Sequence, residues 1–216
     1  MRTDLPATFF AIYTQQSERR EAVMWLPRAA FEGMVRVTQE PVMLPETPGC
    51  RLTCHVTNLS DAPLTVAILY SRGVPMRQSA PIPQLLCRWT ECEEFVMVSA
   101  NIVGNGRCAV PQNEGYALGV VRNDAHVTFG QWETPGEGDE LWTHFARSGT
   151  LSPRFASDRE CILSPALAIA SRFDLPPRGA KSVPFVWAWW LPGQPQNVQP
   201  FANVQQVALR LLQSCM

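Results

Sequence analysis

Lysine is almost absent from this chain, because only one of its 18 basic residues, Lys181, is a lysine. The arginines are scattered along the sequence, and the formal net charge at pH 7 is −1. Proteins that bind nucleic acids or anionic membranes electrostatically carry a clustered positive surface. The sequence therefore predicts no nucleic-acid partner.

Long apolar runs and targeting signals are also missing. No apolar stretch approaches the roughly 20 residues that span a lipid bilayer as a helix. The N-terminal residues MRTDLPATFF lack the basic-then-apolar order of an export signal. We expect a soluble, cytoplasmic protein without a transmembrane segment.

The seven cysteines form no C-x-x-C pair. Cys50–Cys54 and Cys87–Cys92 are the closest spacings, and His55 is the only histidine beside them. A zinc site would need a second cysteine pair or further histidines. We predict reduced, mostly buried thiols, with no metal and no cofactor.

Recognisable catalytic motifs are lacking as well. The sequence has no G-x-S-x-G, no phosphate-binding glycine loop and no H-E-x-x-H, and we interpret His55, His126 and His144 as surface or packing residues. Glycoside hydrolysis uses two carboxylates about 5–10 Å apart. The acidic groups at 91–94 and 137–140 lie beside turn residues, where such clusters are usually hydrated. We predict no catalytic residue in this chain.

Short strands dominate the rest of the sequence. Nineteen prolines and 13 glycines leave little room for long helices, and between them lie runs rich in β-branched and aromatic residues. Alternation places Val35 and Val37 on one strand face, and Leu52, Cys54 and Val56 on another. The predicted strands are residues 7–13, 22–26, 34–38, 52–58, 64–70, 95–102, 117–122 and 126–131. Many short strands separated by turns predict an antiparallel two-sheet β-sandwich or a barrel.

The turn sequence NLSDAP, residues 58–63, predicts that its two flanking strands form a hairpin. Two segments have helical spacing instead. Residues 139–148, DELWTHFARS, precede Gly149 as a helix stop. Residues 203–213 form an amphipathic stripe with Asn203 as the candidate N-cap. The preceding residues, LPGQPQNVQP, read as a linker.

Three tryptophans lie within the segment KSVPFVWAWWLPG, residues 181–193. Alternation places Trp187 and Trp189 on one face and Trp190 on the other, and both faces are apolar. This pattern is typical of a strand covered on both sides. We predict core and inter-domain packing, while sugar stacking on an exposed tryptophan stays open as an alternative.

Several phrases of the sequence together resemble one family. They are VTNLSDAPLTV at 56–66, WTHFARSGTL at 142–151, ALA at 166–168, LPPRG at 175–179, VPFVWAWWLP at 183–192 and FANVQQVALRL at 201–211. In order and spacing they resemble the N-terminal β-sandwich domain of family 116 glycoside hydrolases, which include non-lysosomal glucosylceramidase, the bile-acid β-glucosidase. Ser148 stands where that family often has an acidic residue.

The resemblance implies a supersandwich-like domain over residues 1–192, followed by a linker and helix at 193–216 that lead toward a catalytic domain. It implies no activity for this chain alone, because the family's nucleophile and acid/base carboxylates belong to an (α/α)₆ barrel. That barrel, in the same or a separate chain, is the implied partner, and a glucoside or glycolipid the implied ligand. The family's opening glycine-rich strands have no match here.

Four tryptophans are the predicted carbohydrate- or domain-contact residues: Trp187, Trp189, Trp190 and Trp142. Three functions remain open from the residues alone. The first is a supporting domain of a β-glucosidase. The second is a stand-alone carbohydrate-binding module, and the third is an interaction protein with an immunoglobulin-like sandwich, because one fold serves unrelated functions.

Overall fold

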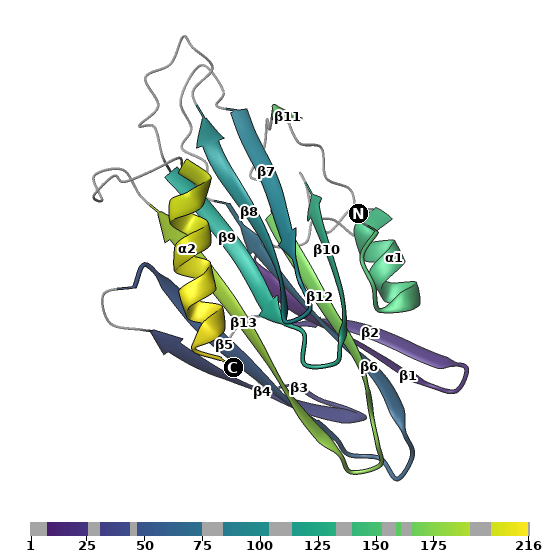
Figure 1. Cartoon of the computed structure of the whole chain (residues 1–216). Coiled ribbons are helices and arrows are strands. Elements are labelled where there is room, and N and C mark those ends of the chain that lie inside the picture. Colours follow the sequence, from purple (N-terminus) through teal and green to yellow (C-terminus); the bar gives the residue numbers. More distant parts are fainter. Residues whose placement is uncertain are drawn as a thin grey trace.

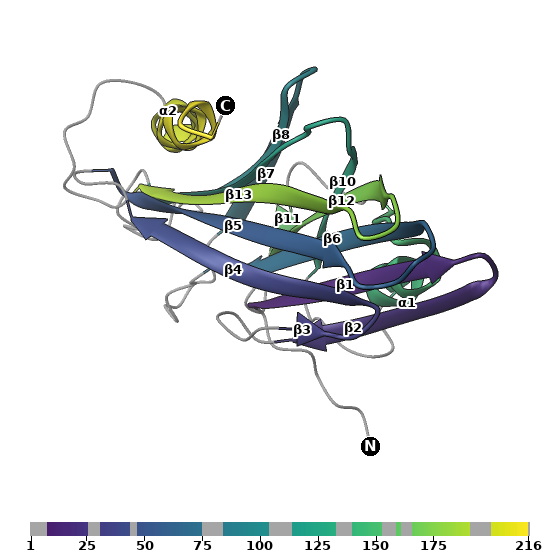
Figure 2. The same ribbon diagram turned by 90° about the horizontal axis from the view of Figure 1, so that it is seen from below.

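Two antiparallel β-sheets lie face to face, with a helix on the outer side of each (Figure 1). The computed structural model describes residues 8–25, 31–43, 47–74, 84–103, 114–132, 140–152, 159–160, 166–190 and 200–215. Seen from below, α2 lies over the eight-stranded sheet and α1 lies on the side of β1 and β2 (Figure 2). The predicted two-sheet, mainly β sandwich is confirmed.

The smaller sheet has five strands in the order β10-β12-β6-β1-β2. Strands β1 and β2 form its hairpin edge, with the turn at Ser17 in the left-handed region at φ 54°. The strands are β10 (His126–Trp132), β12 (Ala166–Leu175), β6 (Leu64–Gly73), β1 (Phe9–Gln16) and β2 (Arg19–Trp25).

The larger sheet has eight strands in the order β11-β7-β8-β9-β13-β5-β4-β3. All of its neighbouring strands pair antiparallel. The strands are β11 (Arg159–Glu160), β7 (Gln84–Glu91), β8 (Phe95–Val103), β9 (Glu114–Val121), β13 (Ala180–Trp190), β5 (Gly49–Asn58), β4 (Val35–Met43) and β3 (Phe31–Glu32).

The main core fills the space between the two sheets. Its centre is aromatic: the rings of Phe10 and Tyr70 stack with centroids 4.4 Å apart, and Phe185 meets Tyr70 edge-on at 5.7 Å. Such edge-on and stacked pairs add about 1 kcal/mol each beyond simple burial. The alternation predicted for residues 35–37 and 52–56 is confirmed, because all of the inward residues join this core.

Both predicted helices exist. Helix α1 (Glu140–Ser148) buries Leu141 and Phe145 against the smaller sheet. Gly149 ends it as predicted, with φ +68° and its N–H donating to the Phe145 carbonyl at 2.8 Å. Helix α2 (Pro200–Gln213) lies on the larger sheet.

The N-cap prediction for α2 is wrong, because the helix begins at Pro200 and Asn203 lies inside its first turn. A proline suits this first turn, where a backbone N–H has no intrahelical partner anyway. Of the predicted linker at 191–200, residues 191–199 lie outside the described residues, and Pro200 begins α2.

Strand positions were predicted better than strand partners. Each of the eight predicted runs overlaps an observed strand, but β7 and β12 were missed, as were the two-residue strands β3 and β11. The predicted hairpin at 58–63 is wrong. Strand β5 pairs with β4 and β13 in the larger sheet, whereas β6 pairs with β1 and β12 in the smaller one.

Candidate functional site

The tryptophan strand β13 is covered on both sides, as its apolar pattern predicts. Val183, Phe185 and Trp187 point into the main core. Val186 and Ala188 on the opposite side lie buried beneath α2. The second cover in this structure is therefore a helix of the same chain.

Trp187 belongs to the inter-sheet core, where it lies beside one aromatic ring and one cationic side chain. Its ring stacks on Tyr116 with centroids 5.6 Å apart, and the Arg72 guanidinium carbon lies 5.3 Å from its ring centroid. Only 3% of Trp187 is exposed. A ring this buried has no open face on which a sugar could stack, so its role within this chain is packing.

Arg72 also contacts the hydroxyl of Tyr70, to which its Nη1 donates at 3.4 Å. Burial raises the pKa of Tyr70 to about 12, although the Arg72 charge opposes this change. Burial likewise raises the pKa of the nearby Cys50 thiol, again against the effect of Arg72. The cluster therefore holds a neutral phenol and a neutral thiol around one guanidinium.

Raising the pH should destabilise the fold through ionisation of this buried phenol. Folding favours the neutral form of the Tyr70 phenol. Its contribution to the stability of the fold is therefore complete below the usual tyrosine pKa near 10, and this contribution is lost as the pH rises toward 12. Tyr70→Phe keeps the ring stack but cannot ionise. Between pH 9 and pH 12 we expect its free energy of unfolding to fall by about 2 kcal/mol less than that of the unmodified chain. Urea unfolding at pH 9 and at pH 12 measures the difference. Parallel pH profiles for both proteins would contradict it.

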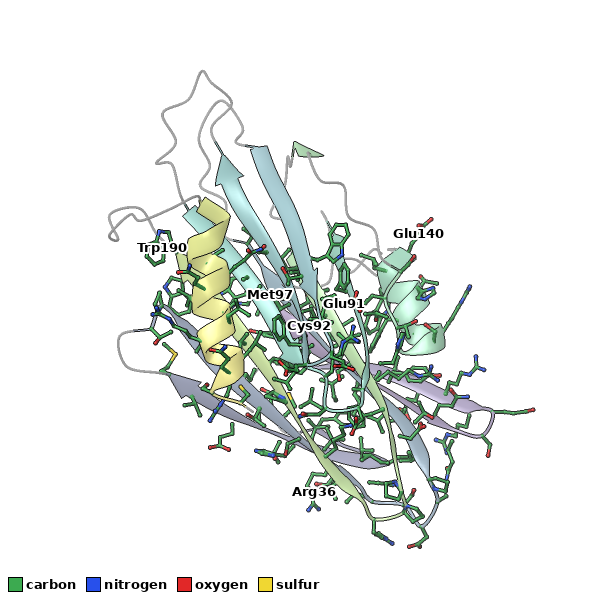
Figure 3. The ribbon with its side chains drawn as sticks, in the orientation of Figure 1. Arg36, Glu91, Cys92, Met97, Glu140 and Trp190 are labelled. Atoms are coloured by element: carbon green, nitrogen blue, oxygen red, sulfur yellow. The ribbon has the colours of Figure 1, made fainter. Side chains whose placement is uncertain are left out.

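Trp189 and Trp190 are half-buried on opposite faces of β13. The backbone N–H of Trp189 donates to the Pro48 carbonyl at 2.9 Å, and its ring packs beside the main core. Trp190 packs against the cluster under α2, near the upper end of that helix in Figure 3. Neither residue is among the exposed large apolar side chains of the described residues.

Trp142 lies on the other side of the molecule. It is on α1, where it meets Phe9 edge-on at 6.4 Å and Phe145 at 6.0 Å. Figure 1 shows α1 and α2 on opposite sides of the sandwich. The four predicted tryptophans thus occupy three separate places: the inter-sheet core, the α2 side and the α1 side.

His55 lies on the polar outer face of β5, as predicted. Its Nδ1 is 2.9 Å from the Ser182 hydroxyl and its Nε2 is 3.3 Å from a Glu40 carboxylate oxygen. Sequence reasoning missed this Ser–His–Glu group because its members are on three strands far apart in the sequence. Nucleophilic catalysis by such a group also needs N–H donors for an oxyanion. His55 pairs with Thr38 of β4 on one side and with Ser182 of β13 on the other, so the backbone of β5 beside this group is used in the sheet.

The other histidines are also exposed side chains. His126 begins β10. His144, on α1, has its Nε2 3.1 Å from the Thr150 hydroxyl. Both positions fit the predicted surface or packing roles.

The acidic group at 91–94 forms the turn between β7 and β8. The Cys92 N–H donates to the Phe95 carbonyl at 3.0 Å, and the Arg122 N–H donates to the Glu94 carbonyl at 2.8 Å. Glu91 forms an ion pair with Arg122. Of the second acidic group, residues 137–139 lie outside the described residues, and Glu140 is exposed at the start of α1.

Four cysteines are free thiols: Cys50, Cys54, Cys92 and Cys215. Cys54 is fully buried, and desolvation raises its pKa. Burial also raises the pKa of Cys215, against the effect of the nearby Arg51. Within the described part of the chain, no three metal-ligating side chains come together. The side chains of Cys87, Cys108 and Cys161 are outside that part.

Trp89 is the exposed tryptophan that the sequence did not reveal. It lies on β7 and is 50% exposed, and Met43 is the only other large apolar side chain exposed among the described residues. The Trp89 ring centroid is 5.8 Å from that of Phe129 on β10. The alternation across residues 84–91 could have indicated the strand. No local sequence pattern, however, identifies Phe129 as the neighbour of Trp89.

The chain forms a two-sheet β-sandwich with a helix on the outer face of each sheet. Residues 46–200 match the family described as "beta-glucosidase 2, glycosyl-hydrolase family 116 N-term". The match extends from just before β5 to the start of α2. The chain belongs to this family of N-terminal domains.

Among the solved structures, three matches each cover 94% of this chain. A polysaccharide lyase matches with a TM-score of 0.50 at 11% identity, over 94% of this chain and 27% of its own. A kojibiose phosphorylase candidate from the human microbiome matches with a TM-score of 0.42 at 6% identity. This match covers 94% of this chain and 24% of the phosphorylase chain. An aldose 1-epimerase candidate from Klebsiella pneumoniae matches with a TM-score of 0.42 at 10% identity. This match covers 94% of this chain and 53% of the epimerase chain.

The chain thus spans between about a quarter and a half of the length of these solved structures. A comparison with curated protein sequences gives no match. No helix in the described residues is long and apolar enough to cross a membrane.

Proposed function

We propose that this chain is the non-catalytic N-terminal domain of a β-glucosidase- or glucosylceramidase-like glycoside hydrolase. In this role it supports an (α/α)₆-barrel catalytic module in carbohydrate or glycosphingolipid metabolism in the cytoplasm. The observation that carries the proposal is the family match over residues 46–200.

The distribution of carboxylates supports a non-catalytic role. Glycoside hydrolysis requires one carboxyl group as acid and a second as nucleophile or base, both aimed at one sugar. In the described structure, Glu40, Glu91 and Asp61 lie on the surface, where each has a basic partner. The barrel would therefore supply both catalytic carboxylates of a retaining reaction.

The position of α2 bears on how a barrel would be attached. Its apolar stripe is buried on β8, β9 and β13; the stripe consists of Val204, Val207, Ala208, Leu211 and Leu212. Arg51 of β5 also donates to the Ser214 carbonyl at 2.9 Å. A barrel that follows α2 would be joined through a helix fixed to the sandwich. We therefore propose a rigid connection, with residues 1–192 as the sandwich and 193–216 as the connecting segment.

The chain alone should not hydrolyse p-nitrophenyl β-glucoside, but it should bind a catalytic barrel of the same family. We expect a stable complex in size-exclusion chromatography with such a barrel expressed separately. Trp190→Ala, beside α2, should weaken the complex by about tenfold if this face carries the contact. Trp142→Ala, on the opposite side, serves as the matched control and should leave it unchanged.

Two outcomes would contradict this proposal. One is β-glucosidase turnover that remains with the purified chain. The other is the absence of any complex with the barrel under conditions in which both proteins are folded.

A further inference from the structure

The exposed face of Trp89 lies at a margin where one sheet extends past the other. Trp89 pairs with Val98, which is buried in the core, so both side chains are on the inner face of the larger sheet. Strand β7 is next to the edge, with only the two-residue β11 beyond it in the described sheet. Strand β10, the edge of the smaller sheet, lies beside β7 in Figures 1 and 2.

Phe129 holds Trp89 in place from the core side. Its ring is half-buried against the main core, and it meets the indole at 5.8 Å with an angle of 34° between the rings. Phe129 thus contacts the indole, while half of Trp89 remains exposed to solvent.

A charged pair flanks the exposed indole. Glu91 is two residues from Trp89 on the same strand and therefore on the same face. It forms an ion pair with Arg122, and the two side chains are 49% and 27% exposed. Figure 3 labels Glu91 on the strand end that faces β10. A carboxylate offers acceptors and a guanidinium has five N–H donors, so the pair can bind neighbouring hydroxyl groups.

A pyranose ring has the complementary surface. One face of a β-glucoside presents several C–H groups, whose positive edge suits the negative π-face of an indole, and its rim carries hydroxyl groups that both donate and accept. We propose that Trp89, Glu91 and Arg122 form a surface subsite for the pyranose ring of a glucoside. The choice of a glucoside rests on the proposed function, and the geometry itself defines a ring-stacking site with a polar flank.

The test is calorimetric titration of the whole chain with methyl β-glucoside. We expect saturable binding that Trp89→Ala weakens about fivefold or more, and that Glu91→Gln weakens with the ring left in place. Sorbitol, which has hydroxyl groups but no pyranose face, should not bind. Met43→Ala removes the other exposed large apolar side chain, on β4, and should leave binding unchanged.

Trp89→Phe keeps an aromatic ring and is the second variant if Trp89→Ala does not fold; it should bind more weakly than the unmodified chain. No binding by the unmodified chain, or equal binding by the tryptophan variants, overturns the subsite. Loss of barrel binding in Trp89→Ala, with no glucoside binding at all, also overturns it and assigns Trp89 to a domain contact. The barrel-binding experiment tests the proposed function separately, so the two can fail independently.

Discussion

Replacing Asn58 with alanine should lower the free energy of unfolding by about 3 kcal/mol. Asn58 is fully buried where the chain crosses from β5 to β6. Its Nδ2 donates to the carbonyls of Ala62 at 2.8 Å and Pro176 at 2.9 Å. Its Oδ1 accepts from the Ser60 N–H at 2.9 Å and from the Ser60 hydroxyl at 2.8 Å. Alanine would leave these partners without their amide.

Two further variants separate the causes. Asn58→Asp keeps the acceptor oxygen but loses the two donated bonds and adds a buried charge, so it should be at least as destabilising as alanine. Asp61→Asn, in the same turn, is the matched control. Asp61 is fully exposed, and its Arg178 partner holds its pKa below the usual range, so its loss should change stability little. Urea denaturation followed by tryptophan fluorescence measures all three, and equal effects at Asn58 and Asp61 would contradict this account.

The same turn shows why a hairpin was predicted where none exists. Asn, Ser, Asp and Pro correctly indicate a chain reversal, but they do not say whether the reversed strand pairs with its predecessor or enters the opposite sheet. Here Asn58 also reaches Pro176, which is 118 residues away and follows β12. The choice between the two paths therefore depends on a contact that no local pattern contains.

The tryptophan strand shows what a local pattern does contain. Two apolar faces in residues 183–191 predicted a strand covered on both sides, and β13 is covered on both sides. The pattern could not identify the covers, because α2 and the smaller sheet come from other parts of the chain. Strand β12 was missed for a related reason. Its residues are buried on both faces, and three alanines in its first five positions favour no particular strand face.

The candidate sugar subsite was less predictable than the fold. A tryptophan's exposure depends on which strand lies over it, and Trp89 is exposed because β7 is near a sheet margin. Its ring neighbour Phe129 and the flanking Arg122 belong to later strands and turns. Clustering in the sequence directed attention to Trp187, Trp189 and Trp190. Trp187 is buried, and the other two are half-buried on β13.

Replacing Gly149 with alanine should also cost about 3 kcal/mol, by two separate effects. The residue has φ +68°, a conformation that costs an alanine about 1–2 kcal/mol. An added Cβ would also lie 2.7 Å from Cδ1 of Tyr13 and 3.1 Å from Cβ of Ala67. Both neighbours are buried on the outer face of the smaller sheet, so relieving the overlap means shifting α1, at a further cost of about 1–3 kcal/mol.

Gly130→Ala is the matched control, because Gly130 also approaches α1. Its added Cβ would lie 3.2 Å from Cδ2 of Leu141, the end of a flexible side chain, and its φ is not positive. Gly149→Asn tests the backbone effect, since asparagine tolerates the left-handed region but carries the same Cβ. We expect thermal unfolding to rank the losses as Gly149→Ala, then Gly149→Asn, then Gly130→Ala. Equal losses for the two Gly149 variants would mean that contact with Tyr13, and not the backbone conformation, requires glycine where α1 ends.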